Sequence, residues 1–303
     1  MKSISKLDDL LTLAKTKPPK RIAVVFADDE HTVEAVYGAV SAGIVEATVT
    51  GNSQNIQNIC DKLSLDSTKL EIIHIPDPLE AGLYCCDMIN QGKSHLIMKG
   101  TITTDDYMRL ILNKERGLME PGSLLSHITV FEPKGYHKLL ICSDVAVIPL
   151  PNLEQKEKIL KFLIDTAHKL GIEEPLCALI APSEKPSKKI PSSADALELM
   201  EKAHSGAFPH AQIAGPMGFD LAIDQEAVDI KGYQNPVGGN ADVILFPNIE
   251  AGNVFYKTAT KFLKAELGAM VVGAKVPAVL SSRGDTAKTK LYSIALAAVT
   301  TDK

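Results

Sequence analysis

The sequence predicts an α/β protein in which a mainly parallel β-sheet is covered by helices on both faces. Short apolar segments rich in β-branched residues alternate with longer segments of helical periodicity, which is the pattern of strand–helix–strand units. Apolar residues make up 45% of the chain and charged residues 23%, as in ordinary globular proteins. The chain has 303 residues, which predicts about two domains at roughly 150 residues each.

The first third of the chain follows this alternation. Residues 22–27 form an apolar run that predicts a buried strand, and Asp28 and Asp29 follow it as capping residues. A helix is expected from there to residue 40, because apolar residues recur at helical spacing. The same patterns predict strands at 44–49, 72–75 and 96–98 and a helix at 81–91.

The pattern changes near the middle of the chain. Strands are predicted at 126–132 and 138–147 with only a few residues between them, which is hairpin spacing and too short for a parallel crossover. Antiparallel strands are therefore expected to join the sheet. Residues 149–152 contain two prolines and precede a long helix, so we expect a domain boundary there.

Alternation then resumes to the end of the chain. A polar stretch at 182–189 is interpreted as a solvated loop, because its four charges sum to only two positive. The predicted helices are 153–170, 192–205, 219–228, 252–267 and 286–300, and the predicted strands are 176–180, 212–214, 241–246, 269–273 and 276–280.

Composition excludes several classes of partner. The 37 acidic and 32 basic residues give a net charge of −5, whereas nucleic-acid and anionic-membrane surfaces need a basic excess. No apolar run reaches the ~18 residues of a membrane span. Asp8 and Asp9 lie where a signal peptide has its apolar stretch. We therefore expect a cytoplasmic protein with no nucleic-acid or membrane partner.

The cysteine spacing and the lack of glycine-rich phosphate loops argue against further classes of site. The five cysteines include no CxxC pair, which fits neither a zinc site nor a disulfide framework, so buried, reduced thiols are expected. The chain also has no GxGxxG or GxxxxGK[ST] loop, which disfavours a standard dinucleotide fold or an ATPase.

One segment with chemical character is 280–286, where an apolar strand turns into a helix. Helix N-termini bind anions through their backbone N–H groups and dipole, and Arg283 adds a bidentate donor for phosphate. Ser282 adds a hydroxyl group. Ordinary capping by Asp285 or Thr286 explains the same residues without a ligand.

Two further strand-to-helix turns carry polar groups. Asn248, Glu250 and Asn253 follow the strand at 241–246, and a helix is expected to begin near Gly252. Lys99, Gly100, Thr101 and Thr103 follow the strand at 96–98, with Thr103 or Thr104 as the expected helix cap. Structural turns remain an alternative in both cases. A cleft between two α/β domains would bring such turns together.

With these segments in view, the sequence resembles the phosphate acetyl/butyryl transferases, and more closely their butyryltransferase branch. The resemblance extends over nearly the whole chain, and the Glu-Ala-Gly-Asn segment at 250–253 and the Ser-Arg pair at 282–283 are its most specific parts. The resembling segments are 98–100, 124–127, 136–140, 153–156, 167–168, 170–173, 215–216, 249–254, 256–257, 271–275, 282–283 and 290–297.

The resemblance implies an activity and an architecture. The family catalyses acyl-CoA + phosphate ⇌ acyl phosphate + CoA without a metal or redox cofactor, so CoA or acyl-CoA and phosphate are the expected substrates. Its fold has two α/β/α domains with a cleft between them, as in the isocitrate/isopropylmalate dehydrogenases. We accordingly expect a discontinuous first domain, 1–149 plus 275–303, and a second domain, 150–274. A homodimer or larger homo-oligomer, and a kinase that consumes the acyl phosphate, are also implied.

By analogy, Arg283 would hold the phosphoryl group and Ser282 would stabilise the tetrahedral intermediate. Lys99, Thr101 and Thr103, with Gly100, would contact phosphate. The resemblance also suggests substrate contacts at Gly215 and Pro216 and at Asn248, Glu250, Gly252 and Asn253. Since CoA and phosphate are anions, we expect a positive site, built from Arg283, Lys99 and helix ends, on a negative surface.

The sequence departs from the family pattern at three places. Thr289 stands where acetyl-type members have the aspartate proposed as the base for the CoA thiol, and Asp285 is the nearest substitute. Ala214 replaces the aspartate that usually precedes Gly-Pro in butyryl-type members. His127 lies where acetyl-type members have a nearby arginine, and its ordinary pKa of about 6.5 suits acid–base chemistry. A buried structural histidine is equally compatible with its position.

The leading hypothesis is transfer of a short-chain acyl group, with butyryl as the expected group, between CoA and phosphate. Acetyl transfer is the alternative in the same class. A dehydrogenase-like enzyme of the same fold is an alternative of a different class. Asp220 and Asp224 could then hold Mg²⁺, although a surface pair is the simpler interpretation. A third alternative is a CoA-binding protein that has lost catalysis, which the Thr289 and Ala214 departures make conceivable.

Overall fold

The computed structural model describes residues 4–281 and 284–301. The chain folds into two compact units, each with its own contacts. The outer unit consists of Leu7–Leu125 and Leu267–Lys303, and the middle unit consists of Ser126–Glu266 with the residues through Lys6. The C-terminal segment thus packs with the N-terminal strands. The division expected from the sequence, at residues 149 and 274, stays a prediction.

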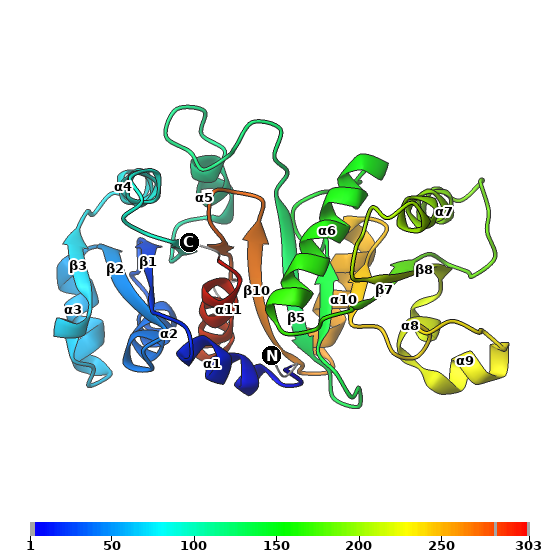
Figure 1. The fold of residues 1–303 in the computed structure, drawn as a ribbon. Helices are drawn as coiled ribbons and strands as arrows, with labels where there is room; N and C mark the ends of the chain where they lie inside the picture. Colours follow the sequence, from blue (N-terminus) through cyan, green and yellow to red (C-terminus); the bar gives the residue numbers. More distant parts are fainter. Residues whose placement is uncertain (1–3, 282–283, 302–303) are drawn as a thin grey trace. The chain divides into compact units, whose positions relative to one another are not determined.

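The outer unit contains six strands in the order β3-β2-β1-β4-β11-β10 (Figure 1). All neighbours pair in parallel except β10 and β11, which are antiparallel. From β1 the chain moves outward to β2 and β3 and then returns to β4 on the other side of β1, so the strand order reverses between β1 and β4. The strands are β1 (Lys20–Val25), β2 (Val45–Gly51), β3 (Glu71–His74), β4 (Leu96–Lys99), β10 (Glu266–Val272) and β11 (Ala278–Val279).

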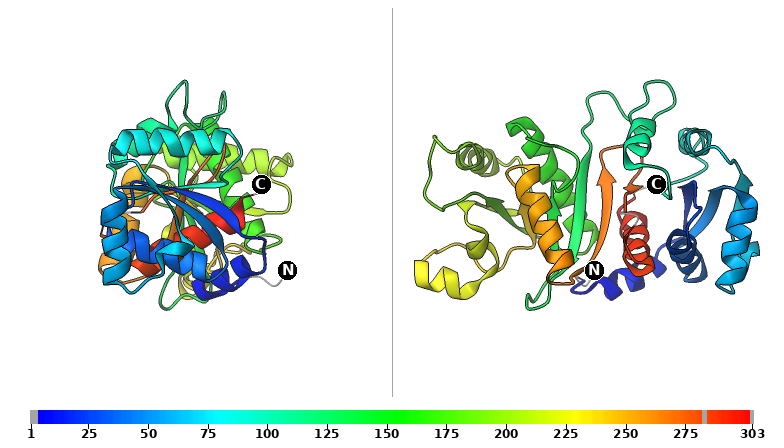
Figure 2. Two further views of the ribbon diagram at one scale, coloured as in Figure 1. Left: turned by 90° about the vertical axis from the view of Figure 1, so that its left-hand side faces the viewer. Right: turned by 180° about the vertical axis from the view of Figure 1, so that it is seen from behind.

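Helices cover both faces of this outer sheet. α2 (Glu30–Ser41) packs against α11 (Ala287–Thr300), and α1 (Leu7–Lys15) also lies against α11. α4 (Pro78–Asn90) and α5 (Thr104–Ile111) pack together on the opposite face (Figures 1 and 2). α3 (Ser53–Lys62) follows β2, and a short 3₁₀ helix spans Ser67–Lys69. The outer unit is therefore a three-layer α/β/α arrangement.

Three predicted helix caps of the outer unit are confirmed. The side chain of Asp29 accepts from the backbone N–H of Thr32 at the start of α2. The Thr103 side chain accepts from the backbone N–H of Asp106 at the start of α5, and the Thr286 side chain accepts from that of Thr289 at the start of α11. These caps fix where each helix begins after its strand.

The middle unit contains five strands in the order β5-β6-β9-β7-β8. β5 and β6 are antiparallel, as the hairpin spacing predicts, and the other neighbours are parallel. α6 (Leu153–Lys169) and α10 (Ile249–Lys261) lie on opposite faces of these strands (Figures 1 and 2). α7 (Pro191–His204) packs against α6. The strands are β5 (Ser126–Glu132), β6 (Leu140–Ser143), β7 (Leu176–Ile180), β8 (Gln212–Met217) and β9 (Val243–Leu245).

Two predicted helices of the middle unit differ from the observed ones. The helix expected at 219–228 is two short helices, α8 (Phe219–Ile223) and α9 (Gln225–Lys231), because Asp224 leaves helical geometry and caps α9. The helix expected at 252–267 is α10, which begins at Ile249 and ends at Lys261. Its N-cap is Asn248, whose side chain accepts from the N–H of Ala251, so Gly252 and Asn253 lie inside the helix.

All five cysteines are buried, as expected. Burial raises the pKa of the Cys85 thiol to about 12 and that of Cys86 to about 11. Thiols with pKa values this high are almost entirely protonated at neutral pH and are poor nucleophiles. In the chain outside residues 1–3, 282–283 and 302–303, no helix is both long and apolar enough to cross a membrane.

Candidate active site

The carboxyl ends of β1, β4 and β11 lie at one edge of the outer sheet. β4 pairs in parallel with both β1 and β11, and Met98 is aligned with Val24 on one side and Val279 on the other. In open α/β sheets, ligands bind outside the carboxyl ends of the strands, where the strand order reverses. The chain after β4 and the chain after β11, which begin two of the three turns singled out in the sequence, therefore leave the sheet at this same edge.

The β4–α5 turn places a buried cation at this edge. Lys99 is 2% exposed, and its Nζ donates to the carbonyl oxygen of Gly100 over 3.1 Å. A Cβ at position 100 would lie 2.3 Å from the carbonyl oxygen of Phe26, so only glycine lets the two turns approach this closely. The N–H and hydroxyl of Thr101 donate to the same oxygen over 2.8 and 2.9 Å.

The hydroxyl of Thr103 caps the N-terminus of α5. It accepts from the backbone N–H of Asp106 over 3.1 Å and donates to the Asp106 carboxylate over 2.7 Å. Thr103 thus has a capping role in the structure beside the phosphate contact predicted for it.

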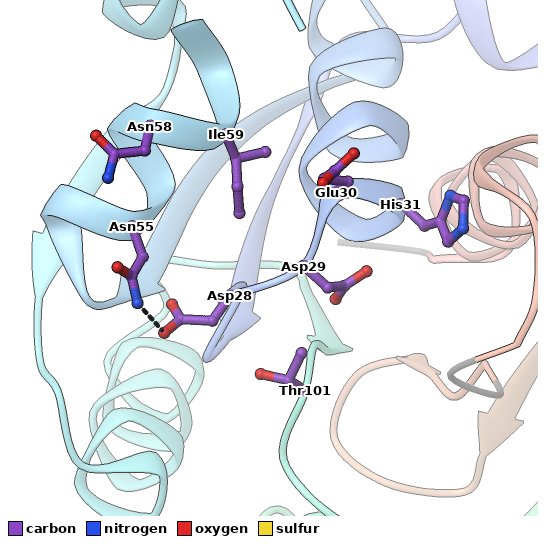
Figure 3. A pocket seen from close by; sticks show the side chains of 8 residues that line it. All are labelled: Asp28, Asp29, Glu30, His31, Asn55, Asn58, Ile59 and Thr101. Carbon is purple, nitrogen blue, oxygen red and sulfur yellow. Dashed lines mark hydrogen bonds between the residues drawn. The ribbon is translucent and has the colours of Figure 1, made fainter. Parts of the chain in front are cut away.

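A pocket of about 660 Å³ opens at the same edge (Figure 3). The turn after β1 contributes consecutive acidic residues to it, and Asn55 of α3 donates to the Asp28 carboxylate over 3.4 Å. Three carboxylates make this lining negative, so the pocket suits uncharged polar groups better than phosphate. Its lining residues are Asp28, Asp29, Glu30, His31, Asn55, Asn58, Ile59 and Thr101.

The β11–α11 turn holds the residues on which the family resemblance depends most. Ser282 and Arg283 lie outside the described residues. Asp285 is half-buried in the turn that leads into α11. Thr289, at the position of the acetyl-type aspartate, donates its backbone N–H to the capping hydroxyl of Thr286 over 3.2 Å. Thr289 therefore belongs to the helix cap.

Sequence reasoning missed a buried lysine beside this turn. Lys290 of α11 is 2% exposed, and its Nζ donates to the Ser281 hydroxyl over 3.3 Å. Burial lowers the pKa of Lys290, and the carboxylates of Asp29 and Asp285 oppose that shift. Helical periodicity alone gives no signal that distinguishes it from an exposed lysine.

The middle unit has a buried anion at the carboxyl end of β6. Asp144 is 2% exposed, and its carboxylate accepts from the Ser126 hydroxyl and from several backbone N–H groups. The donors and distances are Ala146 N (2.8 Å), Val147 N (2.9 Å), Ser126 Oγ (3.1 Å), His127 N (3.3 Å) and Ile148 N (3.3 Å). The carboxylate therefore folds the chain after β6 into a fixed turn.

The glycine and asparagine of the Glu-Ala-Gly-Asn segment support this turn. A Cβ at Gly252 would lie 2.2 Å from the carbonyl oxygen of Asp144. The Asn253 amide donates to the carbonyl oxygen of Val145 over 3.0 Å. Asn248 caps α10, and Glu250 is exposed at its first turn. Three of these four predicted ligand residues thus have structural contacts, which the spacing of the sequence could not reveal.

The remaining predicted residues lie on strands of the middle unit. His127 in β5 is 4% exposed, its Nδ1 lies 3.2 Å from the Thr129 hydroxyl, and its ring meets Tyr256 edge-on. Gly215 and Pro216 lie in β8, at the other end of this strand order from β5. A Cβ at Gly215 would lie 2.6 Å from the Cβ of Leu179 in β7, so glycine permits close strand packing.

The aspartates considered for Mg²⁺ have other partners. Asp220 pairs with Lys231 over 2.7 Å, and Asp224 caps α9. In the ranges 4–281 and 284–301, no group of three or more His, Cys, Asp or Glu is placed to hold a metal ion.

Comparisons with known proteins identify the family. The family described as "Phosphate acetyl/butaryl transferase" matches residues 79–298. The phosphate butyryltransferase of Clostridium acetobutylicum is 38% identical over 296 residues, which is 98% of each chain. The phosphate acetyltransferase of Thermotoga maritima is 34% identical over 293 residues, covering 97% of this chain and 99% of that one.

Solved structures confirm the α/β fold class. A branched-chain phosphotransacylase from Enterococcus faecalis superposes with a TM-score of 0.81 at 27% identity, covering 93% of this chain and 98% of that one. A 4-hydroxythreonine-4-phosphate dehydrogenase from Burkholderia phymatum gives 0.56 at 12% identity, covering 95% and 100%, and shares the fold alone. With the family match over residues 79–298 and two relatives above 30% identity along nearly the whole chain, this protein belongs to the phosphate acetyl/butyryl transferase family.

Proposed function

We propose that this protein transfers a short-chain acyl group, first of all butyryl, between CoA and inorganic phosphate: butyryl-CoA + phosphate ⇌ butyryl phosphate + CoA. The observation that carries the proposal is that the chain leaves the sheet at one edge after both β4 and β11, in a protein of this family. The butyryl preference rests on the 38% identity to a phosphate butyryltransferase, against 34% for a phosphate acetyltransferase.

The chemistry requires a site that desolvates and orients phosphate. Phosphate is a strongly hydrated, weak nucleophile, and it must be held in line with the thioester carbonyl. The buried ammonium of Lys99 and the first turns of α5 and α11 supply positive charge and N–H donors at the same edge. In this proposal Arg283 binds the phosphoryl group and Ser282 donates to the oxyanion of the tetrahedral intermediate.

The leaving thiolate of CoA needs a proton, and in the reverse direction the thiol must lose one. Because the Thr289 backbone and hydroxyl are engaged with Thr286, we assign this proton transfer to Asp285 in the same turn. His127 is the alternative acid–base group, although its burial in β5 favours a structural role. In the middle unit, Glu250 is the exposed candidate for substrate contact, with Gly215 and Pro216 shaping the end of β8.

One assay tests the proposal. CoA release is measured with acetyl-, propionyl-, butyryl- and isobutyryl-CoA, each with and without phosphate. We expect phosphate-dependent release that is fastest with butyryl-CoA. A maximum at acetyl-CoA would assign the protein to acetyl transfer, and no phosphate-dependent release with any acyl group would refute the proposal. NAD(P) reduction with hydroxy acids and Mg²⁺ tests the dehydrogenase alternative.

We further propose a cytoplasmic homodimer or larger homo-oligomer that holds no permanent cofactor and passes its acyl phosphate to a kinase. These assignments rest on the family resemblance. Light scattering coupled to size exclusion measures the oligomeric mass directly, and a monomer at micromolar concentration would contradict the assembly proposal.

A further inference from the structure

Lys290 is a buried ion whose place in the fold calls for a functional explanation. Lysine is almost never fully buried unless its charge is paired, yet Lys290 is 2% exposed on the first turns of α11. Its Nζ donates to the hydroxyl of Ser281 over 3.3 Å. Ser281 lies two residues after the end of β11 and directly precedes Ser282 and Arg283 in the sequence, so this lysine contacts the start of the turn that the proposed chemistry uses.

The charges around Lys290 come from two different turns. Among the residues with described positions, the carboxylates that act on it are Asp29 at the start of α2 and Asp285 before α11. Asp29 is also the N-cap of α2, and α2 packs along α11. Figure 3 shows Asp29 at the end of the β1–α2 turn, among the residues of the acidic pocket. Lys290 thus links the turns that follow β1 and β11 electrostatically.

A second buried lysine lies on the neighbouring strand. Lys99 ends β4, and β4 pairs in parallel with β11, with Met98 beside Val279. Lys99 is as buried as Lys290. One buried ammonium group therefore ends β4, and the other, on α11, contacts the residue Ser281 that follows the neighbouring strand β11. Fixed charges in a water-poor setting act strongly on an anion that forms nearby.

We propose that Lys290 is a positioning residue for acyl transfer: its buried ammonium holds the Ser281 hydroxyl and, with Asp29, supports the β11–α11 turn and keeps it positive. This inference rests on the proposed function. Lys290 does not itself touch the reacting atoms. It acts through Ser281 and through its charge, so its loss should impair phosphate use more than protein folding.

The charge of Lys290 also predicts an unusual pH profile. Burial lowers its pKa below that of ordinary lysines, so the ammonium is lost as the pH rises into the alkaline range, and activity should fall with it. Arginine stays protonated there. The other ionisable groups on the helices and strands packed against α11 are Asp8, Asp9 and Lys15 on α1, Glu30, His31, Glu34 and Tyr37 on α2, and Lys99 on β4.

The experiment compares four variants with the wild type in phosphate-dependent release of CoA from butyryl-CoA. Lys290→Met should lower kcat/KM by about 100-fold, with the KM for phosphate raised, because a small displacement of a site can cost that much. Lys290→Arg should recover part of the activity and move the alkaline limb of the pH profile upward. Lys288→Met is the matched control on the same helix: Lys288 is exposed and lies over the Tyr292 ring, and its loss should leave activity unchanged.

Asp29→Asn should shift the alkaline limb of the pH profile in the direction opposite to Lys290→Arg. This test does not require the Lys290→Met variant to fold. Asparagine keeps the helix cap but removes a carboxylate that raises the pKa of Lys290, so the alkaline limb should move to lower pH. Thermal unfolding of each variant separates folding from activity. An inactive wild type would overturn the proposed function and this inference with it. An active wild type with Lys290→Met equally active, or with both alkaline limbs unmoved, would overturn the positioning role alone.

Discussion

In each of the two units, buried charges lie near the carboxyl ends of the strands, but their sign and their contacts differ between the units. In the outer unit the buried charges are cations: Lys99, whose Nζ donates to the Gly100 carbonyl oxygen, and Lys290 of α11, whose Nζ donates to the Ser281 hydroxyl. At the carboxyl end of β6 in the middle unit the buried charge is an anion, Asp144, whose carboxylate accepts five hydrogen bonds. A carboxylate with five donors is satisfied within the protein and holds a turn. The cations lie where an anionic substrate is expected, so we infer that the outer edge serves chemistry and the middle edge serves structure.

The strongest test of this contrast is removal of the cation at β4. Lys99→Met should reduce kcat/KM by about 1,000-fold, because lost electrostatic stabilisation of a developing charge costs 10²–10³, while the free energy of unfolding changes little. Steady-state kinetics with butyryl-CoA and phosphate measure the first quantity, and urea unfolding measures the second. Lys93→Met, at an exposed lysine just before β4, is the control. If Lys99→Met keeps wild-type kinetics, the outer edge is not the phosphate site.

Asp144 should show the reverse pattern. Asp144→Ala leaves several buried N–H groups without an acceptor, each costing about 1–3 kcal/mol, so we expect a loss of about 3 kcal/mol or more in unfolding free energy. Asp144→Asn keeps one acceptor oxygen and should lose less. Urea denaturation gives both values. A stable Asp144→Ala protein with abolished turnover would place Asp144 in the chemistry and would break the contrast.

Substitution of Gly252 in α10 tests how this helix supports the turn at Asp144. A Cβ there would lie 2.2 Å from the Asp144 carbonyl oxygen, and overpacking of this kind costs about 1–3 kcal/mol. Gly252→Ala should therefore lower the midpoint of urea unfolding. Gly38→Ala in α2 is the matched control, because a Cβ there meets its nearest atom, on Leu291, at 3.9 Å. Alanine at position 38 should be neutral or slightly stabilising, since glycine is the weaker helix former. Equal stability of the two variants would show that α10 does not hold the turn.

The sequence predicts the fold better than it predicts the site, for a physical reason. The bounds of β5 and β7 match their predictions because local patterns of apolar residues determine them. No helix is predicted at 7–15, although Leu7, Leu10, Leu13 and Ala14 share one buried face of α1 and carry a local signal for it. In α3 only Ile56 and Cys60 are buried, which is too few for a periodic pattern.

The roles of the site residues depend instead on tertiary contacts, which the sequence does not show. The strand predicted at 138–147 includes Asp144, whereas β6 ends at Ser143. No local sequence pattern indicates that the Asp144 carboxylate accepts hydrogen bonds from five donors. Lys290 on a helix looks like any solvated lysine until packing buries it. Gly252 suggests a helix start, but its observed reason is the close approach of the Asp144 carbonyl. A sequence motif therefore locates such a turn, and only the fold shows which of its residues are left for a ligand.

The smallest expected effects come from the helix caps, which allow the two units to be compared with the same chemistry. Thr103 caps α5 in the outer unit and Asn248 caps α10 in the middle unit, and replacing either with alanine should cost about 1 kcal/mol of stability. The units should differ in catalysis. Thr103→Ala should also raise the KM for phosphate, because the α5 N-terminus lies at the proposed phosphate site, while Asn248→Ala should change stability alone. Thr103→Ser, which keeps the hydroxyl, should restore the KM. If Asn248→Ala instead raises the KM and Thr103→Ala does not, the roles assigned to the two edges must be exchanged.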